Sequence, residues 1–186
     1  MKEFPSGEVE VGKEGMKVGP FPKKVKIVEV GARDGLQSEP SIVPTEDKIC
    51  LIDKLSSCGH SSIEVGAFVS SKWIPQMADS AQVFEGIEKK EAVSYPVLTP
   101  NIIGYQRAKE VGAKEVAIFA SATESFSKRN INRTIAKSLE RYTLVTEAAK
   151  KDGIKVRGYV SVVLGCPYEG KFASQKRNGC HSLFSQ

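Results

Sequence analysis

The feature that most constrains this sequence is a regular alternation of short apolar runs and amphipathic stretches, which begins at Val25. Each apolar run has the length of one buried strand, and each amphipathic stretch has the length of a helix. This spacing predicts right-handed βαβ units and a parallel sheet. The sheet belongs either to a closed (β/α)₈ barrel or to an open, doubly wound fold. The predicted strands are 25–30, 61–65, 94–99, 114–120 and 156–163.

Four helices are predicted between these strands. They cover residues 45–58, 80–89, 102–112 and 132–153. The last one ends in Asp152-Gly153, a typical stop signal. The simplest interpretation of the segment ESFSKRNIN before it is a polar loop, with Asn132 as the cap that begins the helix.

Charged residues follow the first two predicted strands. Arg33 and Asp34 come just after the first strand, and Glu64 lies at or near the end of the second. In parallel folds, functional groups gather at the carboxyl ends of the strands. Two carboxylates and a guanidinium brought together there could hold a divalent metal and offset a developing negative charge.

Simpler interpretations of these residues remain open. Asp34-Gly35 is also a common turn, and an Arg-Asp pair is more often a surface ion pair than a metal site. Glu64 is harder to dismiss, because an unpaired carboxylate inside an apolar strand is costly and needs a partner. Cys166 is most simply a small buried residue, and His60 and His181 are expected at the surface.

Composition argues against several function classes. The net charge of +5 comes from lysines spread along the chain, so nucleic-acid binding is unsupported. No apolar run reaches the length of a membrane span. The four cysteines form no C-x-x-C pair and no zinc spacing, which favours reduced thiols. Residues 1–24 are interpreted as a flexible polar leader, because they lack the composition of a transit or signal peptide.

Five segments in order resemble the 3-hydroxy-3-methylglutaryl-CoA lyase family, from about Val25 to Lys171. The match rests on long segments in register and not on the RDG tripeptide, which is shared with related acyl-CoA condensing enzymes. The segments are VEVGARDGLQSE, SSIEVGAFVSSKWIPQMAD, YPVLTPN, ESFSKRNIN and VRGYVSVVLGCPYEGK.

The resemblance implies a (β/α)₈ TIM barrel that cleaves 3-hydroxy-3-methylglutaryl-CoA to acetyl-CoA and acetoacetate with Mg²⁺ or Mn²⁺, in leucine catabolism and ketone-body formation. It implies that Asp34 ligates the metal, that Arg33 stabilises the departing enolate and binds substrate, and that Glu64 orients the arginine. By the same resemblance, the residues near the substrate are Gln37, Arg157 and Tyr159. The family's usual Ser-Phe after the second strand is Ala67-Phe68 here, which removes a hydroxyl.

The chain also departs from the family after Lys171. The family continues there into a His-x-His pair, an asparagine and a loop with the catalytic cysteine, whereas residues 172–186 form a divergent tail. Neither Cys166, by its register, nor His181 replaces those groups. We therefore expect the first five units of a barrel (residues 25–171) and no turnover by the 186-residue chain itself.

Alternatives to the lyase are a non-catalytic fragment that acts by association and a condensing enzyme such as isopropylmalate or homocitrate synthase. The family is chiefly mitochondrial and habitually dimeric, which makes a mitochondrial location and a homodimer expectations, with the cytoplasm as the alternative compartment.

Overall fold

The computed structural model describes residues 24–171. The expected leader, except for Lys24, and the whole expected tail 172–186 lie outside the described residues, and so do Cys180 and His181.

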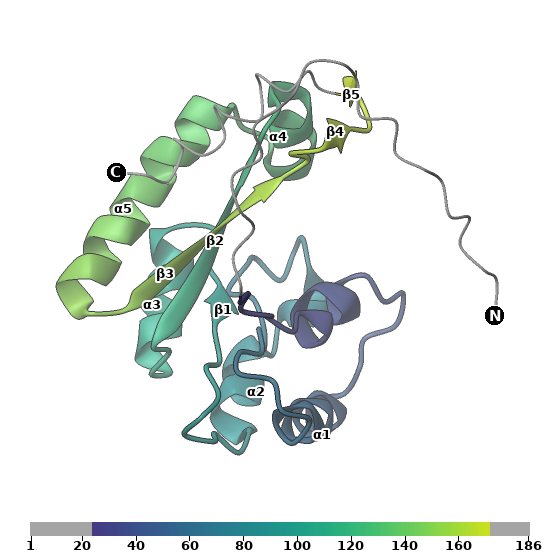
Figure 1. Ribbon diagram of the computed structural model, residues 1–186, viewed down its shortest axis with the longest axis vertical. Coiled ribbons are helices and arrows are strands. Elements are labelled where there is room, and N and C mark those ends of the chain that lie inside the picture. Colours follow the sequence, from purple (N-terminus) through teal and green to yellow (C-terminus); the bar gives the residue numbers. More distant parts are fainter. Residues whose placement is uncertain (1–23, 172–186) are drawn as a thin grey trace.

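Three of the five predicted strands lie side by side in chain order (Figure 1). Strands β1 (Val97–Leu98), β2 (Glu115–Ser121) and β3 (Lys155–Ser161) form a parallel sheet in the order β1-β2-β3. Two extended segments precede β1. A single parallel bridge from Glu29 to Ile63 joins them to each other, and the bridge from Ala67 to Leu98 joins the second segment to β1. All neighbours in this sheet are parallel and consecutive, so the prediction of an α/β fold that forms part of a (β/α)₈ barrel is confirmed.

The four predicted helices are all present, with shorter ends. They are α1 (Thr45–Ser56), α2 (Ser80–Gly86), α3 (Ile102–Glu110) and α5 (Ile135–Asp152). Short elements complete the described chain: a π-helical turn η1 (Gly31–Gly35), a 3₁₀ turn η2 (Pro75–Met77), and the antiparallel pair β4 (Gly165–Cys166) and β5 (Gly170–Lys171).

The interpretation of the segment before α5 as a polar loop is wrong, because this segment forms a further helix, α4 (Glu124–Ile131). Asn132 does not begin α5. Its backbone is left-handed, with φ 52°, and it ends α4. Thr134 caps α5 instead, since its side chain accepts a hydrogen bond from the Lys137 amide. Asn is one of the few residues that tolerate a left-handed backbone, so the same residue type suits the end of α4 as well as the start of a helix.

The first predicted strand is not buried along its whole length. Val25 is 68% exposed and Ile27 is 69% exposed, and cover begins only at Val28. Among the described residues this segment has a strand neighbour on one side only, through Glu29 and Ile63. An extended run needs cover on both faces and both edges to be buried completely.

Strand residues alternate between two apolar layers. On β2, Val116 and Ile118 face the helices, whereas Ala117 and Phe119 belong to a second cluster on the opposite face. Tyr159 packs with this second cluster, which therefore marks the inner face of the barrel segment. None of the helices between residues 24 and 171 combines the length and apolar character needed to cross a bilayer.

Candidate functional site

Arg33 and Asp34 are positioned by η1, which begins immediately after the first extended segment. The Asp34 amide donates to the Val30 carbonyl at 2.7 Å, and the Gly31 amide donates to the Glu29 carboxylate at 2.6 Å. A Cβ at position 31 would lie 2.8 Å from that carboxylate oxygen, so any larger residue there would displace the Glu29 side chain from its bond to the turn. The turn thus places the charged pair directly at the carboxyl end of the strand.

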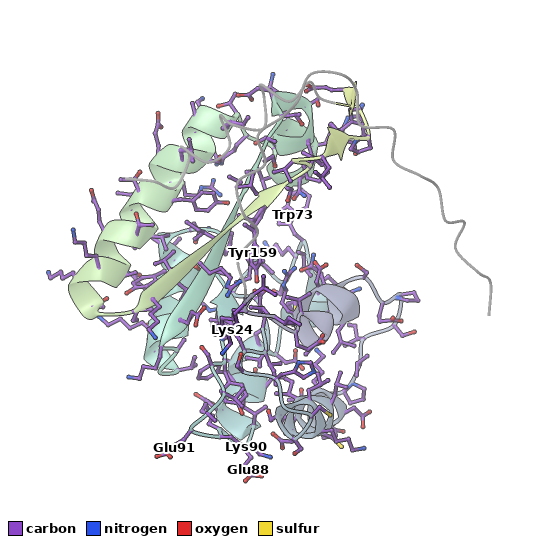
Figure 2. All side chains as sticks on the ribbon, in the orientation of Figure 1. Lys24, Trp73, Glu88, Lys90, Glu91 and Tyr159 are labelled. Atoms are coloured by element: carbon purple, nitrogen blue, oxygen red, sulfur yellow. The ribbon has the colours of Figure 1, made fainter. Side chains whose placement is uncertain are left out.

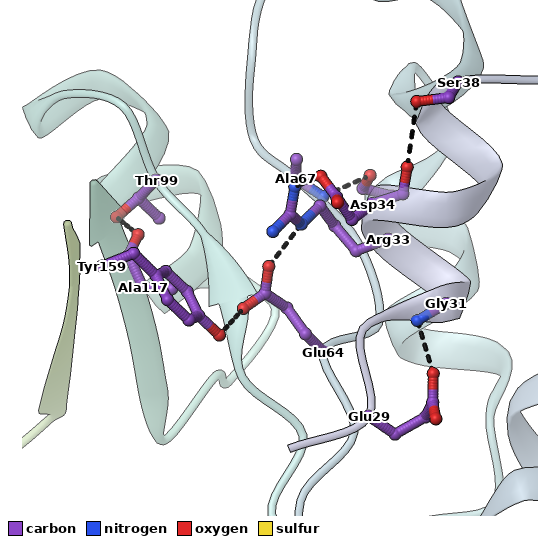
Figure 3. A network of polar contacts seen from close by, with 11 residues as sticks. Glu29, Gly31, Arg33, Asp34, Ser38, Glu64, Ala67, Thr99, Ala117 and Tyr159 are labelled. Atoms are coloured by element: carbon purple, nitrogen blue, oxygen red, sulfur yellow. Dashed lines mark hydrogen bonds and ion pairs between the residues drawn. The ribbon is translucent and has the colours of Figure 1, made fainter. Parts of the chain in front are cut away.

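Glu64 is the centre of a polar network on the inner face (Figure 3). Its neighbours Ile63 and Val65 belong to the helix-facing layer, so alternation turns Glu64 inward, where it is fully buried. Arg33 Nε donates to Glu64 Oε1, and the Tyr159 hydroxyl donates to Glu64 Oε2 at 2.7 Å. The prediction that Glu64 has a partner is confirmed, and it has two.

The Tyr159 hydroxyl acts as a donor in this network. Burial raises its pKa above the ordinary tyrosine value, and the hydrogen bond to Glu64 raises this pKa further. The phenol therefore keeps its proton, and both Glu64 oxygens stay occupied by donors.

Asp34 differs from Glu64 in its exposure. Arg33 Nη1 lies 2.5 Å from Asp34 Oδ1, but the Asp34 side chain is 62% exposed, against 12% for Arg33. One guanidinium thus bridges a buried carboxylate and an exposed one. The exposed carboxylate is the group that remains accessible to a ligand.

A cavity of about 930 Å³ opens over this network. Arg33, Asp34, Gln37 and Tyr159 line it, together with residues that follow the other strands. The volume lies within the range of small-molecule sites. Gln37 Oε1 is buried and has no hydrogen-bond partner among the described residues, so it offers an acceptor to a ligand.

Arg157 meets this cluster only at Tyr159, since its guanidinium carbon lies 5.9 Å from the centroid of the Tyr159 ring, and it does not line the cavity. Its Nε is 3.7 Å from Glu115 Oε1, and Glu115 also accepts from the Ser94 hydroxyl at 2.7 Å. Both residues lie near the amino ends of β2 and β3, away from the cavity lining. Every predicted site residue except Arg157 belongs to the polar network or lines the cavity, and the contact of Arg157 with substrate stays a prediction.

Two other predicted features also lie outside the cavity lining. Ala67 is buried beside Leu98, with which it forms a parallel bridge, so the hydroxyl missing at this position would fall within an apolar layer. Cys166 is 4% exposed and accepts a hydrogen bond from the Thr123 hydroxyl at 3.3 Å. Its interpretation as a small buried residue is confirmed.

Sequence reasoning missed several residues of the cavity. Trp73 lines it from the loop after the second strand segment, and three arginines line it from α4, α5 and the turn between them. The sequence did contain one signal for Trp73, because an isolated tryptophan in a polar loop can indicate a ligand site. The arginines, by contrast, reach the cavity only through the packing of α4 and α5. They are Arg129, Arg133 and Arg141.

The described residues can supply part of a metal site. Between residues 24 and 171 there is no group of three or more His, Cys, Asp or Glu side chains placed to hold one ion. The accessible Asp34 carboxylate and the unpartnered Gln37 oxygen are hard oxygen donors that line one cavity. Mg²⁺ characteristically uses one or two carboxylates and keeps several waters or substrate oxygens, so this donor set fits such an ion.

The described chain consists of parallel βα units, and a network of carboxylate, guanidinium and phenol groups lies beside a cavity at the strand ends. These features define an α/β-barrel protein with a polar ligand site. The particular family follows from its sequence model, which matches residues 24–176. The chain belongs to the HMGL-like family.

Known relatives agree with this assignment. The mitochondrial hydroxymethylglutaryl-CoA lyase of Bos taurus is 60% identical over 159 residues, which are 86% of this chain and 49% of the relative. The cytoplasmic 3-hydroxy-3-methylglutaryl-CoA lyase of Danio rerio is 61% identical over 151 residues, 81% of this chain and 45% of the relative. The chain thus spans about half the length of the curated relatives it matches.

A solved structure supports the same fold. The crystal structure of hydroxymethylglutaryl-CoA lyase from Pseudomonas aeruginosa matches with a TM-score of 0.85 and 52% sequence identity. The match covers 89% of this chain and 55% of that chain.

Proposed function

We propose that this chain carries the Arg33, Asp34 and Glu64 part of a hydroxymethylglutaryl-CoA lyase site. The reaction is the cleavage of 3-hydroxy-3-methylglutaryl-CoA to acetyl-CoA and acetoacetate. The observation that carries the proposal is a guanidinium fixed between a buried and an accessible carboxylate at the floor of a cavity. The names of the relatives support the choice of substrate.

Arg33 is the group suited to the charge that develops in this reaction. When the carbon–carbon bond breaks, its electron pair passes to the thioester carbon and oxygen as an enolate. Arg33 uses Nε for Glu64 and one Nη1 hydrogen for Asp34, which leaves further N–H groups for that oxygen. A preorganised cation of this kind stabilises the transition state more than the substrate.

Glu64 serves as a positioning residue and not as the base. Both of its oxygens already accept hydrogen bonds, from Arg33 and from Tyr159. Because Glu64 is fully buried, its charge also balances the guanidinium in a region of low dielectric.

Asp34 and Gln37 are the described residues proposed to hold a divalent metal, Mg²⁺ or Mn²⁺. When bound, such an ion polarises the tertiary hydroxyl of the substrate and lowers the pKa of that hydroxyl. The Asp34 carboxylate supplies the negative charge that retains the ion in the cavity.

The first experiment measures acetoacetate release and substrate binding by the purified 186-residue chain, with and without Mg²⁺. We expect calorimetry to detect Mg²⁺-dependent binding of 3-hydroxy-3-methylglutaryl-CoA, and we expect Asp34→Asn to weaken it at least tenfold because a carboxylate ligand is lost. Asp53→Asn, an acidic residue on α1 outside the cavity, is the control.

Turnover then separates the alternatives. Acetoacetate release that Asp34→Asn abolishes identifies the chain itself as a lyase. Binding without release favours the non-catalytic fragment, which acts by association, for example as one partner of a homodimer. Absence of any Mg²⁺-dependent binding contradicts the proposal. Condensation of acetyl-CoA with a 2-oxo acid points instead to a condensing enzyme.

We further propose a mitochondrial setting, in leucine catabolism and ketone-body formation. The Bos taurus relative is named as mitochondrial, and the Danio rerio relative is named as cytoplasmic, which keeps the cytoplasm as the alternative. Fractionation of cells that express the chain, with a carboxyl-terminal tag, decides between the two compartments.

A further inference from the structure

We propose that Lys48 is a positioning residue for the cavity. Its buried ammonium fixes the 70–79 loop, which carries Trp73 and Ile74 into the cavity lining. Figure 2 shows Trp73 near Tyr159, which lines the same cavity. Only the choice of ligand in the test below rests on the proposed function.

Lys48 occupies a position of α1 that the helical period assigns to an apolar residue. Lys48, Ile52 and Ser56 recur every four residues and are the buried residues of this helix. Lys48 is only 3% exposed, and lysine is rarely buried to this degree unless its ammonium is paired. Because an apolar residue of similar volume satisfies burial as well or better, the charge at this position indicates a specific contact.

The ammonium makes this contact with the 70–79 loop. Lys48 Nζ donates to the Gln76 carbonyl at 2.6 Å and to Asp79 Oδ1 at 2.7 Å. The second oxygen of Asp79, Oδ2, accepts from the Thr45 hydroxyl at 2.7 Å. Side chains of α1 therefore hold both oxygens of this carboxylate, and the ion pair is largely shielded from water, with 4% exposure of the lysine side chain and 21% exposure of the aspartate side chain.

The backbone hydrogen bonds around Trp73 lie within the loop itself. The amides of Trp73 and Ile74 donate to the Ser70 carbonyl, at 3.0 and 3.1 Å. Such bonds fold the loop, but they do not fix its place relative to the sheet. Ile74 and Met77 pack against the inner apolar cluster, which is a contact without directional preference. The directional anchor of the loop is therefore Lys48.

The same anchor reaches a second segment of the cavity. Gln76 offers its backbone carbonyl to Lys48, and its side-chain Nε2 donates to the Glu39 carbonyl at 2.8 Å. Glu39 follows η1, two residues after Gln37, which lines the cavity. Loss of the ammonium should therefore loosen the loop and the segment around Gln37 together, whereas η1 keeps its own bonds.

Lys48→Met tests the anchor, because methionine keeps much of the volume and removes the charge. Trp73 is the only tryptophan of the chain, so its time-resolved fluorescence anisotropy reports on this loop alone. We expect a larger fast component of the anisotropy decay in Lys48→Met than in the wild type. Hydrogen exchange at the amides of residues 70–79 should accelerate about tenfold or more, with exchange in α5 unchanged.

Two further variants make this test specific. Lys54→Met is the matched control, since Lys54 is exposed on the same helix, and it should leave the anisotropy and the exchange as in the wild type. The double variant Lys48→Met/Asp79→Leu removes both charges, so that no carboxylate stays unpaired in case the single variant is too unstable to study. It should show the same loosened loop.

Binding measurements then relate the loop to the cavity. The Mg²⁺-dependent affinity for 3-hydroxy-3-methylglutaryl-CoA, measured by calorimetry, should fall about fivefold in both Lys48 variants, because a loosened loop must be ordered on binding. The loss should be equal in the two variants even where their urea denaturation curves differ, which separates positioning from stability. Lys54→Met should bind like the wild type.

The inference is overturned if the anisotropy and the exchange of residues 70–79 match the wild type. It is also overturned if exchange in α5 rises by the same factor or if neither Lys48 variant folds, since Lys48 would then support the fold as a whole. A loosened loop with unchanged affinity overturns the positioning role and leaves the lyase proposal standing. The loop measurements need no ligand, so a wild-type chain that binds no acyl-CoA contradicts the lyase proposal alone.

Discussion

At the scale of single residues, the site depends on one buried carboxylate. Glu64 lies at 0% exposure between the Arg33 guanidinium and the Tyr159 hydroxyl. Removal of one partner from such a pair leaves the other charge buried and uncompensated, which costs far more than loss of an exposed pair.

Glu64→Gln should therefore lower the free energy of unfolding by about 3 kcal/mol, because Arg33 loses its buried counter-charge. Urea denaturation measures the change. The control is Lys109→Ala, which breaks the pair with Asp152 from a side chain that is 52% exposed and should cost about 0.5 kcal/mol. Equal effects of the two substitutions would contradict a buried, charge-balanced network.

Arg157 allows two interpretations that experiment can separate. Its guanidinium lies beside Glu115, with the Arg157 side chain 27% exposed. We expect Arg157→Gln to lower the free energy of unfolding by about 1 kcal/mol and to leave the affinity of the folded protein for acyl-CoA unchanged. Arg133→Gln should show the opposite pattern. Loss of affinity without loss of stability in Arg157→Gln would support the substrate contact implied by the family.

At the scale of elements, helix ends were harder to predict than helices. The periodicity of residues 132–153 predicted α5, and Gly153 marked its end correctly, since its φ of +69° suits glycine. The start was wrong because a polar residue before a helix can cap it or end the preceding one. The choice depends on the contact of α4 with β2, which no local pattern contains.

Gly153→Ala should destabilise the protein by about 1 kcal/mol, because alanine pays a steric cost in the left-handed region that glycine avoids. Thermal or urea unfolding tests this. Gly35→Ala is the matched control, since a Cβ there meets nothing within 4 Å and the backbone φ is not left-handed. If both variants lose the same stability, the helix end is not the cause.

The residues of the site also divide into those that a local sequence pattern predicts and those that depend on packing between distant segments. Arg33, Asp34 and Glu64 were predictable because parallel strands bring their carboxyl ends together whatever the details of packing. Trp73 and Arg141 were not, because their shared cavity depends on how a loop and a helix pack across several units. The exposure of Val25 was also missed, since it depends on neighbours and not on the run itself.

At the scale of the whole molecule, the burial of tyrosines makes the free energy of unfolding depend on pH. Burial raises the pKa of Tyr142 from its ordinary value of 10.0 to about 12, with a smaller opposing effect from Arg141. Between these values the unfolded chain has lost this proton and the folded chain keeps it. Stability therefore falls as the pH rises through this window.

Tyr142→Phe should remove this dependence in part. Between pH 10 and pH 12 the wild-type protein should lose about 2 kcal/mol more unfolding free energy than the variant, because phenylalanine has no proton to lose. Urea denaturation across the window measures the difference. Thr143→Ala, an exposed substitution on the same helix, should follow the wild type. Parallel curves for Tyr142→Phe and the wild type would contradict a raised pKa.

The network around Glu64 also has a consequence for synthesis on the ribosome. The hydrogen bond from Tyr159 to Glu64 spans 95 residues. At roughly 5 to 20 residues per second, Tyr159 is made about 5 to 20 s after Glu64. During that interval the carboxylate has only part of its final environment, so we expect it to stay hydrated until Tyr159 is available. We therefore expect the nascent amino-terminal units to pack fully only after β3 is made, and to be exposed to chaperones until then.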